Sequence, residues 1–179
     1  MAHALPVIYT IGYGGRTLDE FLRLLNEFSV QAVADVRRWN SPRRRQEFSG
    51  ENLEEELGRV GVKYYWFPRL GGYRKFGVDV EDRGIAGCFE SEGFRAYATY
   101  ITTRSEALED LEKLEGIARS MATALMCCER LPWRCHRKIL ADYFVARGFR
   151  ALHIVDSREV REHKPSKCAV VSGSSLRYV

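Results

Sequence analysis

The sequence has no long apolar run and no evident targeting segment. No stretch of its 179 residues approaches the roughly 20 apolar residues that a membrane-spanning helix requires. Residues 1–15 lack a basic start and a long apolar segment, so we expect no secretory signal there. Apolar residues still make up 45% of the chain, which excludes disorder throughout. Length and composition together predict one soluble globular domain.

The chain has five cysteines, an odd count that leaves at least one without a disulfide partner in the chain. Cys127 and Cys128 are adjacent within an apolar run, a spacing that is not typical of a disulfide framework. A small secreted protein held together by disulfides is therefore disfavoured. We expect reduced thiols and a cytoplasmic location.

Positive charge is concentrated in two short segments, although the net charge is only +4. Five arginines fall within residues 37–45, and a second basic group lies within residues 130–138. Acidic residues gather elsewhere, at 51–56 and 106–115. This segregation predicts an anionic partner such as a nucleotide, DNA or RNA. We expect no membrane partner, and the sequence leaves the oligomeric state open.

Strand and helix patterns alternate along the chain, which predicts a parallel sheet with helices on both faces. Thr17, with Glu20 three residues on, predicts a capping box at the first helix. Right-handed crossovers favour an α/β fold of three layers. Its sheet would be mostly parallel and five-stranded, in a Rossmann-like order 3-2-1-4-5. Expected strands are 7–11, 31–36, 62–67, 122–128 and 150–155, and expected helices begin near 17, 52, 92, 106 and 134.

The domain organisation expected from this pattern is simple. Residues 1–156 would form a single α/β domain. Residues 157–179 are polar, basic and serine-rich, and we expect them to form a loosely ordered tail.

Ligands of such sheets bind beyond the carboxyl ends of the strands, where the winding reverses. The rule predicts that Gly12, Asp35 and Glu129, at the ends of three strands, lie at one edge of the sheet. Asp35 is an acid within an apolar run, and a buried acid needs a partner. Arg37 lies two residues on and therefore on the same face. We expect Asp35 to pair with Arg37, or else with His136 or Arg137.

The loop after the first strand contains Gly12, Tyr13, Gly14 and Gly15 and leads into a helix. Its backbone N–H groups could bind an anion, or the loop could be a tight turn and nothing more. The loop is not a G-x-G-x-x-G fingerprint, because Thr17 stands where the third glycine would be. No acid follows the second strand in the manner that binds a ribose, and we expect no cofactor.

Residues 127–137 are the richest segment in chemistry. Glu129 could act as a general acid/base, with His136 or a cysteine assisting. Cys135 would open the next helix, whose positive end lowers a thiol pKa. The structural alternative is a helix start with a hydrogen-bonded His136, preceded by Cys127 as a small buried hydrophobe.

Two further alternatives involve Cys128. A metal could be held by Cys128, Cys135 and His136, with His153 as a fourth candidate. The six residues between Cys128 and Cys135 exceed the usual spacing of zinc ligand pairs, so we expect no metal. Cys128 and Arg134 also have the C-x5-R spacing of a phosphatase loop. Pro132 disfavours that interpretation because it removes one backbone N–H group.

The arginine loop, residues 37–45, has aromatic residues close by at Trp39 and Phe48. Arginines bind phosphates through paired donors, and aromatic rings stack on bases. Arg37 and Arg43 are candidate ligand-binding residues on this ground. The alternative is a solvated basic loop without a partner.

Several short segments together resemble domain-of-unknown-function family 488. The resemblance runs from about residue 7 to residue 155 and implies a compact α/β fold with a polar site. It implies no substrate. Tyr13 stands where the family often has a histidine, and in the family's spacing the cysteine two before the glutamate is Cys127, which disfavours chemistry at Cys128. The segments are YTIGY at 9–13, DVR at 35–37, SPR at 41–43, LGG at 70–72, CCE at 127–129, CHR at 135–137 and HI at 153–154.

We therefore expect an enzyme that acts on a phosphate-containing ligand by hydrolytic or transfer chemistry. The alternative is a non-catalytic nucleic-acid-binding module, in which the arginine loop is the whole function. The candidate catalytic residues are Glu129, Cys135 and His136, and the candidate ligand-binding residues are Gly12, Tyr13, Asp35, Arg37, Arg43 and Arg137.

Overall fold

Strands and helices alternate along the chain, as the sequence predicts. The computed structural model describes residues 4–179. The main sheet contains β1 (Val7–Gly12), β2 (Ala32–Asp35), β3 (Lys63–Trp66), β4 (Thr123–Cys127), β5 (Arg150–Asp156) and β6 (Glu159–Glu162). The helices are α1 (Leu18–Glu27), α2 (Gly50–Arg59), α3 (Glu92–Thr103), α4 (Ser105–Ser120) and α5 (Arg137–Ala146). Strands β7 (Ala169–Ser172) and β8 (Ser175–Tyr178) form a separate hairpin.

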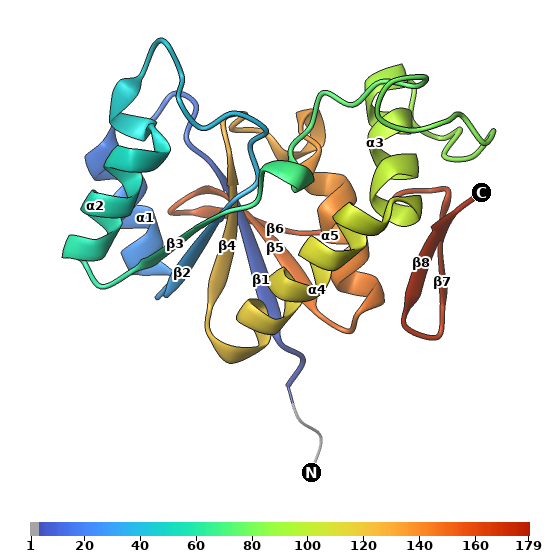
Figure 1. Cartoon of the computed structure of the whole chain (residues 1–179). Coiled ribbons are helices and arrows are strands. Elements are labelled where there is room, and N and C mark those ends of the chain that lie inside the picture. The colour runs from blue at the N-terminus through green and yellow to red at the C-terminus, as the bar shows by residue number, and fades with distance from the viewer. Residues whose placement is uncertain (1–3) are drawn as a thin grey trace.

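The main sheet has the order β3-β2-β4-β1-β5-β6. All neighbours are parallel except β6, which runs antiparallel to β5. Helices α1 and α2 lie on one side of the sheet, and α3, α4 and α5 lie on the other (Figure 1). The three-layer, mostly parallel α/β fold is therefore confirmed.

The sheet departs from the expected five-stranded order 3-2-1-4-5 in two respects. β4 lies between β1 and β2, since Thr123 pairs with Ile8 on one side and Ala32 on the other. β4 is apolar and wholly buried, as a central strand must be, but hydrophobicity does not reveal which two strands flank it. The sixth strand, β6, was not predicted because its sequence EVRE is charged and largely exposed.

Helix boundaries follow local sequence signals closely. The Thr17 hydroxyl accepts the Glu20 N–H at 3.1 Å, and the Glu20 carboxylate accepts the Thr17 N–H at 3.4 Å, which confirms the capping box. The last helix begins at Arg137 because the residues from Pro132 to Arg134 form a separate 3₁₀ turn. Cys135 therefore precedes the helix. Between residues 4 and 179, no helix is long and apolar enough to cross a membrane.

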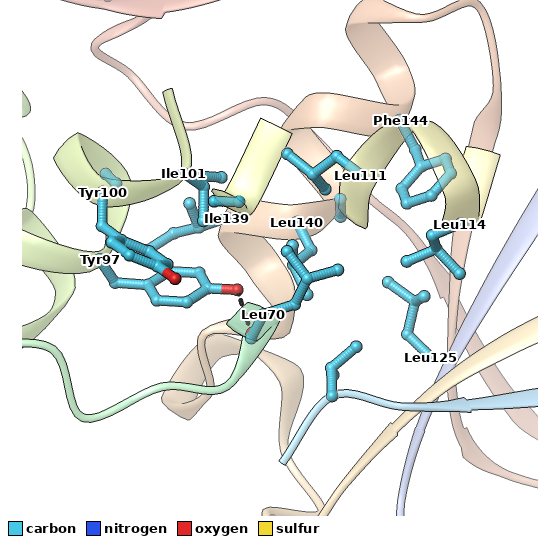
Figure 2. Packing of buried hydrophobic residues seen from close by; sticks show 14 of the residues in the cluster. Leu70, Tyr97, Tyr100, Ile101, Leu111, Leu114, Leu125, Ile139, Leu140 and Phe144 are labelled. Carbon is cyan, nitrogen blue, oxygen red and sulfur yellow. Dashed lines mark hydrogen bonds between the residues drawn. The ribbon is translucent and has the colours of Figure 1, made fainter. Parts of the chain in front are cut away.

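Each side of the sheet has its own hydrophobic core. Phe21 and Phe48 belong to the core beneath α1 and α2. Figure 2 shows part of the other core, to which Phe144 of α5 contributes. The Tyr97 hydroxyl of α3 donates to the Leu70 carbonyl at 2.6 Å, which fastens the segment before Gly71 and Gly72 to α3 (Figure 2).

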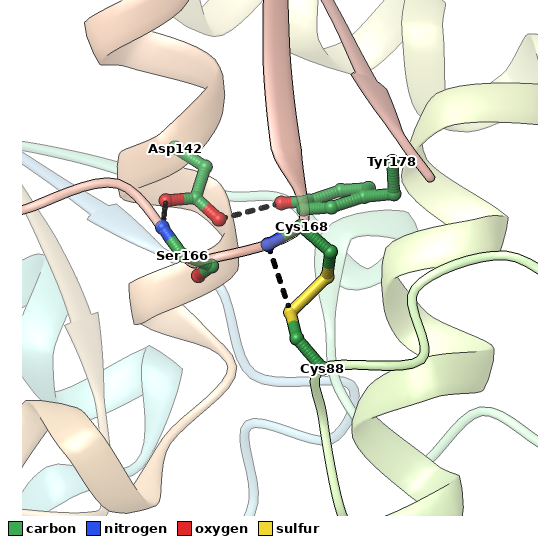
Figure 3. The surroundings of a disulfide bond; sticks show 5 residues. All are labelled: Cys88, Asp142, Ser166, Cys168 and Tyr178. Atoms are coloured by element: carbon green, nitrogen blue, oxygen red, sulfur yellow. Dashed lines mark hydrogen bonds between the residues drawn. A yellow bond between two sulfur atoms is a disulfide. The ribbon is translucent and has the colours of Figure 1, made fainter.

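The C-terminal segment, expected as a loosely ordered tail, is structured. It adds β6 to the sheet and then forms the β7–β8 hairpin, which packs near α3 and α5. The carboxylate of Asp142 in α5 accepts the Ser166 N–H at 2.9 Å and the Tyr178 hydroxyl at 2.7 Å (Figure 3). These hydrogen bonds attach the polar C-terminal segment to α5. The composition of residues 157–179 does not reveal them, so the expectation of a loosely ordered tail is wrong.

Two cysteines are joined by a disulfide between Cys88 and Cys168, 80 residues apart (Figure 3). The expectation of reduced thiols is wrong for this pair. The hairpin brings Cys168 beside the loop that carries Cys88, and sequence spacing cannot predict this approach. Cys127, Cys128 and Cys135 are free thiols.

A buried hydrogen-bond chain runs through His153 of β5. The Thr10 hydroxyl lies 2.6 Å from His153 Nδ1, and His153 Nε2 lies 2.9 Å from His163 Nδ1. His163 Nε2 in turn lies 2.7 Å from the Asp142 carboxylate. Asp142 accepts a hydrogen bond from His163 Nε2, which leaves His163 Nδ1 as an acceptor. A neutral His153 that donates from Nε2 satisfies this acceptor.

The first prediction concerns His153 and acid. Burial, with the charges of His163 and Arg137, lowers the pKa of His153 from 6.5 to about 3. Between pH 6.5 and about pH 3, His153 is protonated in the unfolded chain but neutral in the folded protein. The free energy of unfolding therefore falls as the pH drops below 6.5. At about 1.4 kcal/mol per pH unit, lowering the pH from 7 to 4.5 costs about 2–3 kcal/mol through this residue.

The measurement is urea unfolding of the protein and of a His153→Gln variant at both pH values. Carboxylates titrate in the same range in both proteins, so the comparison isolates the histidine. We expect the variant to lose about 2–3 kcal/mol less than the unaltered protein. Equal losses would show that His153 does not resist protonation.

Candidate functional site

A cavity of about 450 Å³ lies at the edge of the sheet where β1, β2 and β4 end. We call it the edge cavity. Tyr13, Arg37 and Glu129, which follow these three strands, all line it. The predicted convergence of the three loops is therefore confirmed. Other lining residues include Arg38, Trp39, Gly72, Tyr73, Tyr97, Cys127, Cys128, Arg134, Cys135 and His136.

Asp35 and Arg37 form the buried pair that the sequence predicts. The guanidinium donates to the carboxylate from Nε at 2.9 Å and from Nη2 at 2.7 Å. Tyr64 donates its hydroxyl to the same carboxylate at 2.5 Å. Burial opposes the charge of Arg37, but the bonds from Asp35 outweigh it and raise the pKa of Arg37. Arg37 is thus a fixed positive charge beside the cavity, oriented by Asp35.

The glycine loop after β1 packs closely against the backbone of the loop after β4. A Cβ added at Gly12 would lie 1.8 Å from the Glu129 carbonyl oxygen, so the two loops are in backbone contact. The N–H groups of Tyr13 and Gly14 donate to the carbonyls of Cys127 and Cys128. These donors are consequently not free for an anion. The geometry favours the tight turn over the anion-binding loop.

Two thiols and an imidazole meet where β4 ends and α5 begins. Cys135 Sγ lies 3.3 Å from Cys127 Sγ and 3.6 Å from His136 Nδ1. The Val36 carbonyl, which can only accept, lies 2.8 Å from His136 Nε2. Nε2 therefore carries a proton: in the neutral imidazole the Nδ1 lone pair faces the sulfur, and in the protonated ring Nδ1 donates to it.

Arg137 is fully buried against this group. Its guanidinium donates to Cys135 Sγ at 3.3 Å, to the Thr10 hydroxyl at 3.1 Å and to the Glu129 carbonyl. No carboxylate of residues 4–179 hydrogen-bonds to Arg137. A buried cation is stabilised by a partner of opposite charge, so Arg137 favours the thiolate form of Cys135.

The two thiols differ in acidity for the same reason. Burial opposes ionisation of Cys135, but the hydrogen bond from Cys127 and the charges of His136 and Arg137 lower the pKa of Cys135 well below its ordinary value. Cys127 donates that hydrogen bond, which raises the pKa of Cys127 well above the ordinary value. Cys135 is therefore the more acidic thiol of the pair.

Other candidates are distributed around the cavity. Glu129 lines it and accepts the Leu131 N–H at 3.1 Å, which fixes one carboxylate oxygen. Arg134 lines the cavity and is exposed. Arg43 is exposed in the arginine loop and is not among the lining residues. Gly12 and Asp35 do not line the cavity. Gly12 packs against the Glu129 backbone, and Asp35 orients Arg37.

The sequence missed the partner of Cys135. The spacing along the chain groups Cys128 with Cys135 and His136, but Cys128 follows the end of β4 and interacts with Tyr13. Cys127 faces Cys135 instead. The family spacing, which singles out Cys127, was the signal that could have identified it. His153 belongs to the separate chain with His163.

A family model described as "Domain of unknown function DUF488" matches residues 17–144, well over half of the chain. The chain belongs to the DUF488 family. The DUF488 match includes Asp35, Arg37, Glu129 and Cys135, whereas Tyr13 lies outside it. Neither a curated protein nor a solved structure matches the chain. The DUF488 description names no activity, so function must be argued from the edge cavity itself.

Proposed function

We propose that this protein is an enzyme that acts on a phosphate-containing ligand, a nucleotide or a nucleic acid, by hydrolytic or transfer chemistry. The observation that supports this most directly is the composition of the edge cavity. Arg37, Arg38 and Arg134 line it together with a single carboxylate, Glu129. Arginine binds phosphate through paired donors, and a carboxylate can move a proton during the reaction.

The cavity provides separate places for binding and for proton transfer. Arg37 is held by Asp35, so its position costs little on binding. Trp39 and Tyr73 are exposed at 66% and 80%, and their rings lie 6.0 Å apart at the cavity wall. Exposed aromatic faces of this kind stack on nucleobases. The ligand would then bind beyond the carboxyl ends of the strands, as ligands do in Rossmann-like folds.

Glu129 is the residue on which this proposal depends. A Glu129→Gln variant keeps the size of the side chain but cannot accept a proton. We expect it to lose about 10²–10⁴-fold in turnover while its affinity for the ligand stays nearly unchanged. Turnover is measured on a panel of nucleotides, phosphodiesters and short DNA and RNA strands. Glu54→Gln, on the exposed face of α2, is the matched control.

Two outcomes of that experiment contradict the proposal. One is the absence of turnover on the whole panel. The other is full turnover in the Glu129→Gln variant, which would remove the proposed proton transfer from this carboxylate.

A non-catalytic nucleic-acid-binding module is the second candidate, and the arginine loop favours it. Arg43 and Arg44 are exposed, and within the described chain neither has an ion pair or a side-chain hydrogen bond. Arg45 differs, because it stacks on Phe48 and pairs with Glu47. In the same binding assay, replacing Arg43 and Arg44 with alanine should weaken binding to single strands and reduce the salt slope by about 1.4, at ~0.7 per phosphate. If the unaltered protein binds single strands in this salt-dependent way but shows no turnover, it is a non-catalytic nucleic-acid-binding module.

A cytoplasmic location stays a prediction. Cys127, Cys128 and Cys135 are free thiols, as a reducing compartment would keep them. The Cys88–Cys168 bond is uncommon in such a compartment.

A further inference from the structure

Three buried donor atoms converge at the edge cavity. The Sγ atoms of Cys127 and Cys135 and a ring nitrogen of His136 all lie within 4.8 Å of one another. We infer that Cys127, Cys135 and His136 form a three-ligand site for a zinc ion, with its fourth position open to the edge cavity. This inference goes beyond the proposed function, since it depends on neither the phosphate nor Glu129.

The donor set and its spacing suit zinc. Sulfur and imidazole nitrogen are the preferred ligands of this ion, and three protein ligands with one open position are typical of catalytic zinc sites. Bond lengths of about 2.3 Å and 2.0–2.1 Å at tetrahedral angles place two sulfurs about 3.8 Å apart and sulfur and nitrogen about 3.6 Å apart. The observed distances are 3.3 Å between the sulfurs and 3.6 Å from Cys135 Sγ to His136 Nδ1. The two sulfurs must separate by about half an ångström to bind one ion, and the third pair of donors lies within 4.8 Å.

The imidazole is already oriented as a ligand. His136 Nε2–H donates to the Val36 carbonyl at 2.8 Å, which fixes the tautomer and leaves Nδ1 for a metal. Metal-bound histidines almost always have such a partner on the other nitrogen. A Cβ at Gly72 would lie 3.0 Å from Nδ1, so glycine at this position keeps that nitrogen uncovered.

The sulfur of Cys135 also accepts two hydrogen bonds from Arg137. The Arg137 backbone N–H lies 3.5 Å from Cys135 Sγ, and the guanidinium Nε lies 3.3 Å from it. Hydrogen bonds to ligating atoms are the usual surroundings of a metal site.

The charges indicate what binds at the fourth position. A zinc ion, two thiolates and a neutral imidazole sum to zero, and buried Arg137 adds one positive charge. An anion at the open position neutralises the site, and both hydroxide and a phosphate oxygen meet this requirement. Zinc lowers the pKa of bound water to about 7, so a hydroxide is available there near neutral pH.

The test measures metal binding directly, without any substrate. The full chain is purified under reducing conditions without chelator, and zinc per chain is determined by mass spectrometry. The chain is then stripped and titrated with Co²⁺, whose absorption reports tetrahedral geometry and sulfur ligation. We expect one zinc per chain, and in the unaltered protein the cobalt spectrum of a site with two sulfur ligands.

Variants assign the ligands. Cys127→Ser, Cys135→Ser and His136→Gln should each weaken Co²⁺ binding by more than about 100-fold, since losing only a hydrogen-bond partner of a ligand already costs 10–100-fold. Cys128→Ser changes the neighbouring thiol, which is not one of the three converging donors, and should bind cobalt as the unaltered protein does. Circular dichroism of each variant separates loss of the site from loss of the fold.

Several results would overturn the inference. One is that the reduced protein binds neither zinc nor cobalt. This result counts equally if Cys127 and Cys135 form a disulfide in the protein before reduction. Another is cobalt binding without a sulfur band. A third is binding that survives in folded Cys127→Ser and Cys135→Ser variants. Zinc binding together with inactivity toward every phosphate compound supports the site and contradicts only the proposed function.

Discussion

Replacing Gly12 with alanine should destabilise the protein by at least about 3 kcal/mol, because the new methyl group would meet backbone rather than a side chain. The added Cβ would lie 1.8 Å from the Glu129 carbonyl oxygen and 2.8 Å from Arg130 Cα. A side chain can rotate away from such a contact, whereas here the loop after β4 must move. The same loop carries Glu129, so the displacement reaches the edge cavity. Urea unfolding measures the loss of stability.

Gly58→Ala is the matched control for this change. Gly58 lies in α2, and nothing lies within 4 Å of the position that its Cβ would take. Alanine is favoured over glycine in a helix, so this variant should be more stable by about 0.5–1 kcal/mol. Equal stability of the Gly12→Ala variant and the unaltered protein would show that the two loops are not in fixed contact.

The location of the site could be predicted from the sequence because it depends on few signals. Parallel strands end at one edge, and β2, β4 and β1 are neighbours in the sheet, so Tyr13, Arg37 and Glu129 meet at one cavity. The change in strand order did not affect this result, since both orders leave β1 and β4 adjacent. The Asp35–Arg37 pair followed from the need of a buried acid for a partner.

The remaining features depend on contacts between distant segments. Strand alternation predicts that Cys127 and Cys128 face opposite sides, but only the path of residues 129–136 decides which of them meets Cys135. The Cys88–Cys168 bond spans 80 residues and requires the β7–β8 hairpin to return to the core. Local periodicity contains no information about either approach.

Asparagine in place of Asp35 should cost about 3–5 kcal/mol of stability, the largest effect expected from a change that leaves side-chain volume intact. Asp35 is wholly buried and accepts four hydrogen bonds, three from Arg37 and one from Tyr64. The amide group would remove the negative charge and direct N–H groups at a guanidinium that has only donors. Arg37 is itself 7% exposed, so its charge would stay buried and uncompensated.

A surface pair and a double variant make this prediction specific. Glu47→Gln breaks the exposed pair with Arg45 and should cost less than about 1 kcal/mol. Replacing Asp35 and Arg37 together, by asparagine and methionine, removes the buried charge that causes the penalty, so the double variant should be more stable than Asp35→Asn alone. Chemical unfolding of Asp35→Asn, Arg37→Met and the double variant gives the coupling energy between the two sites. Additive effects of Asp35 and Arg37 would mean that the pair does not hold the arginine at the edge cavity, because the cost would then come from each residue separately.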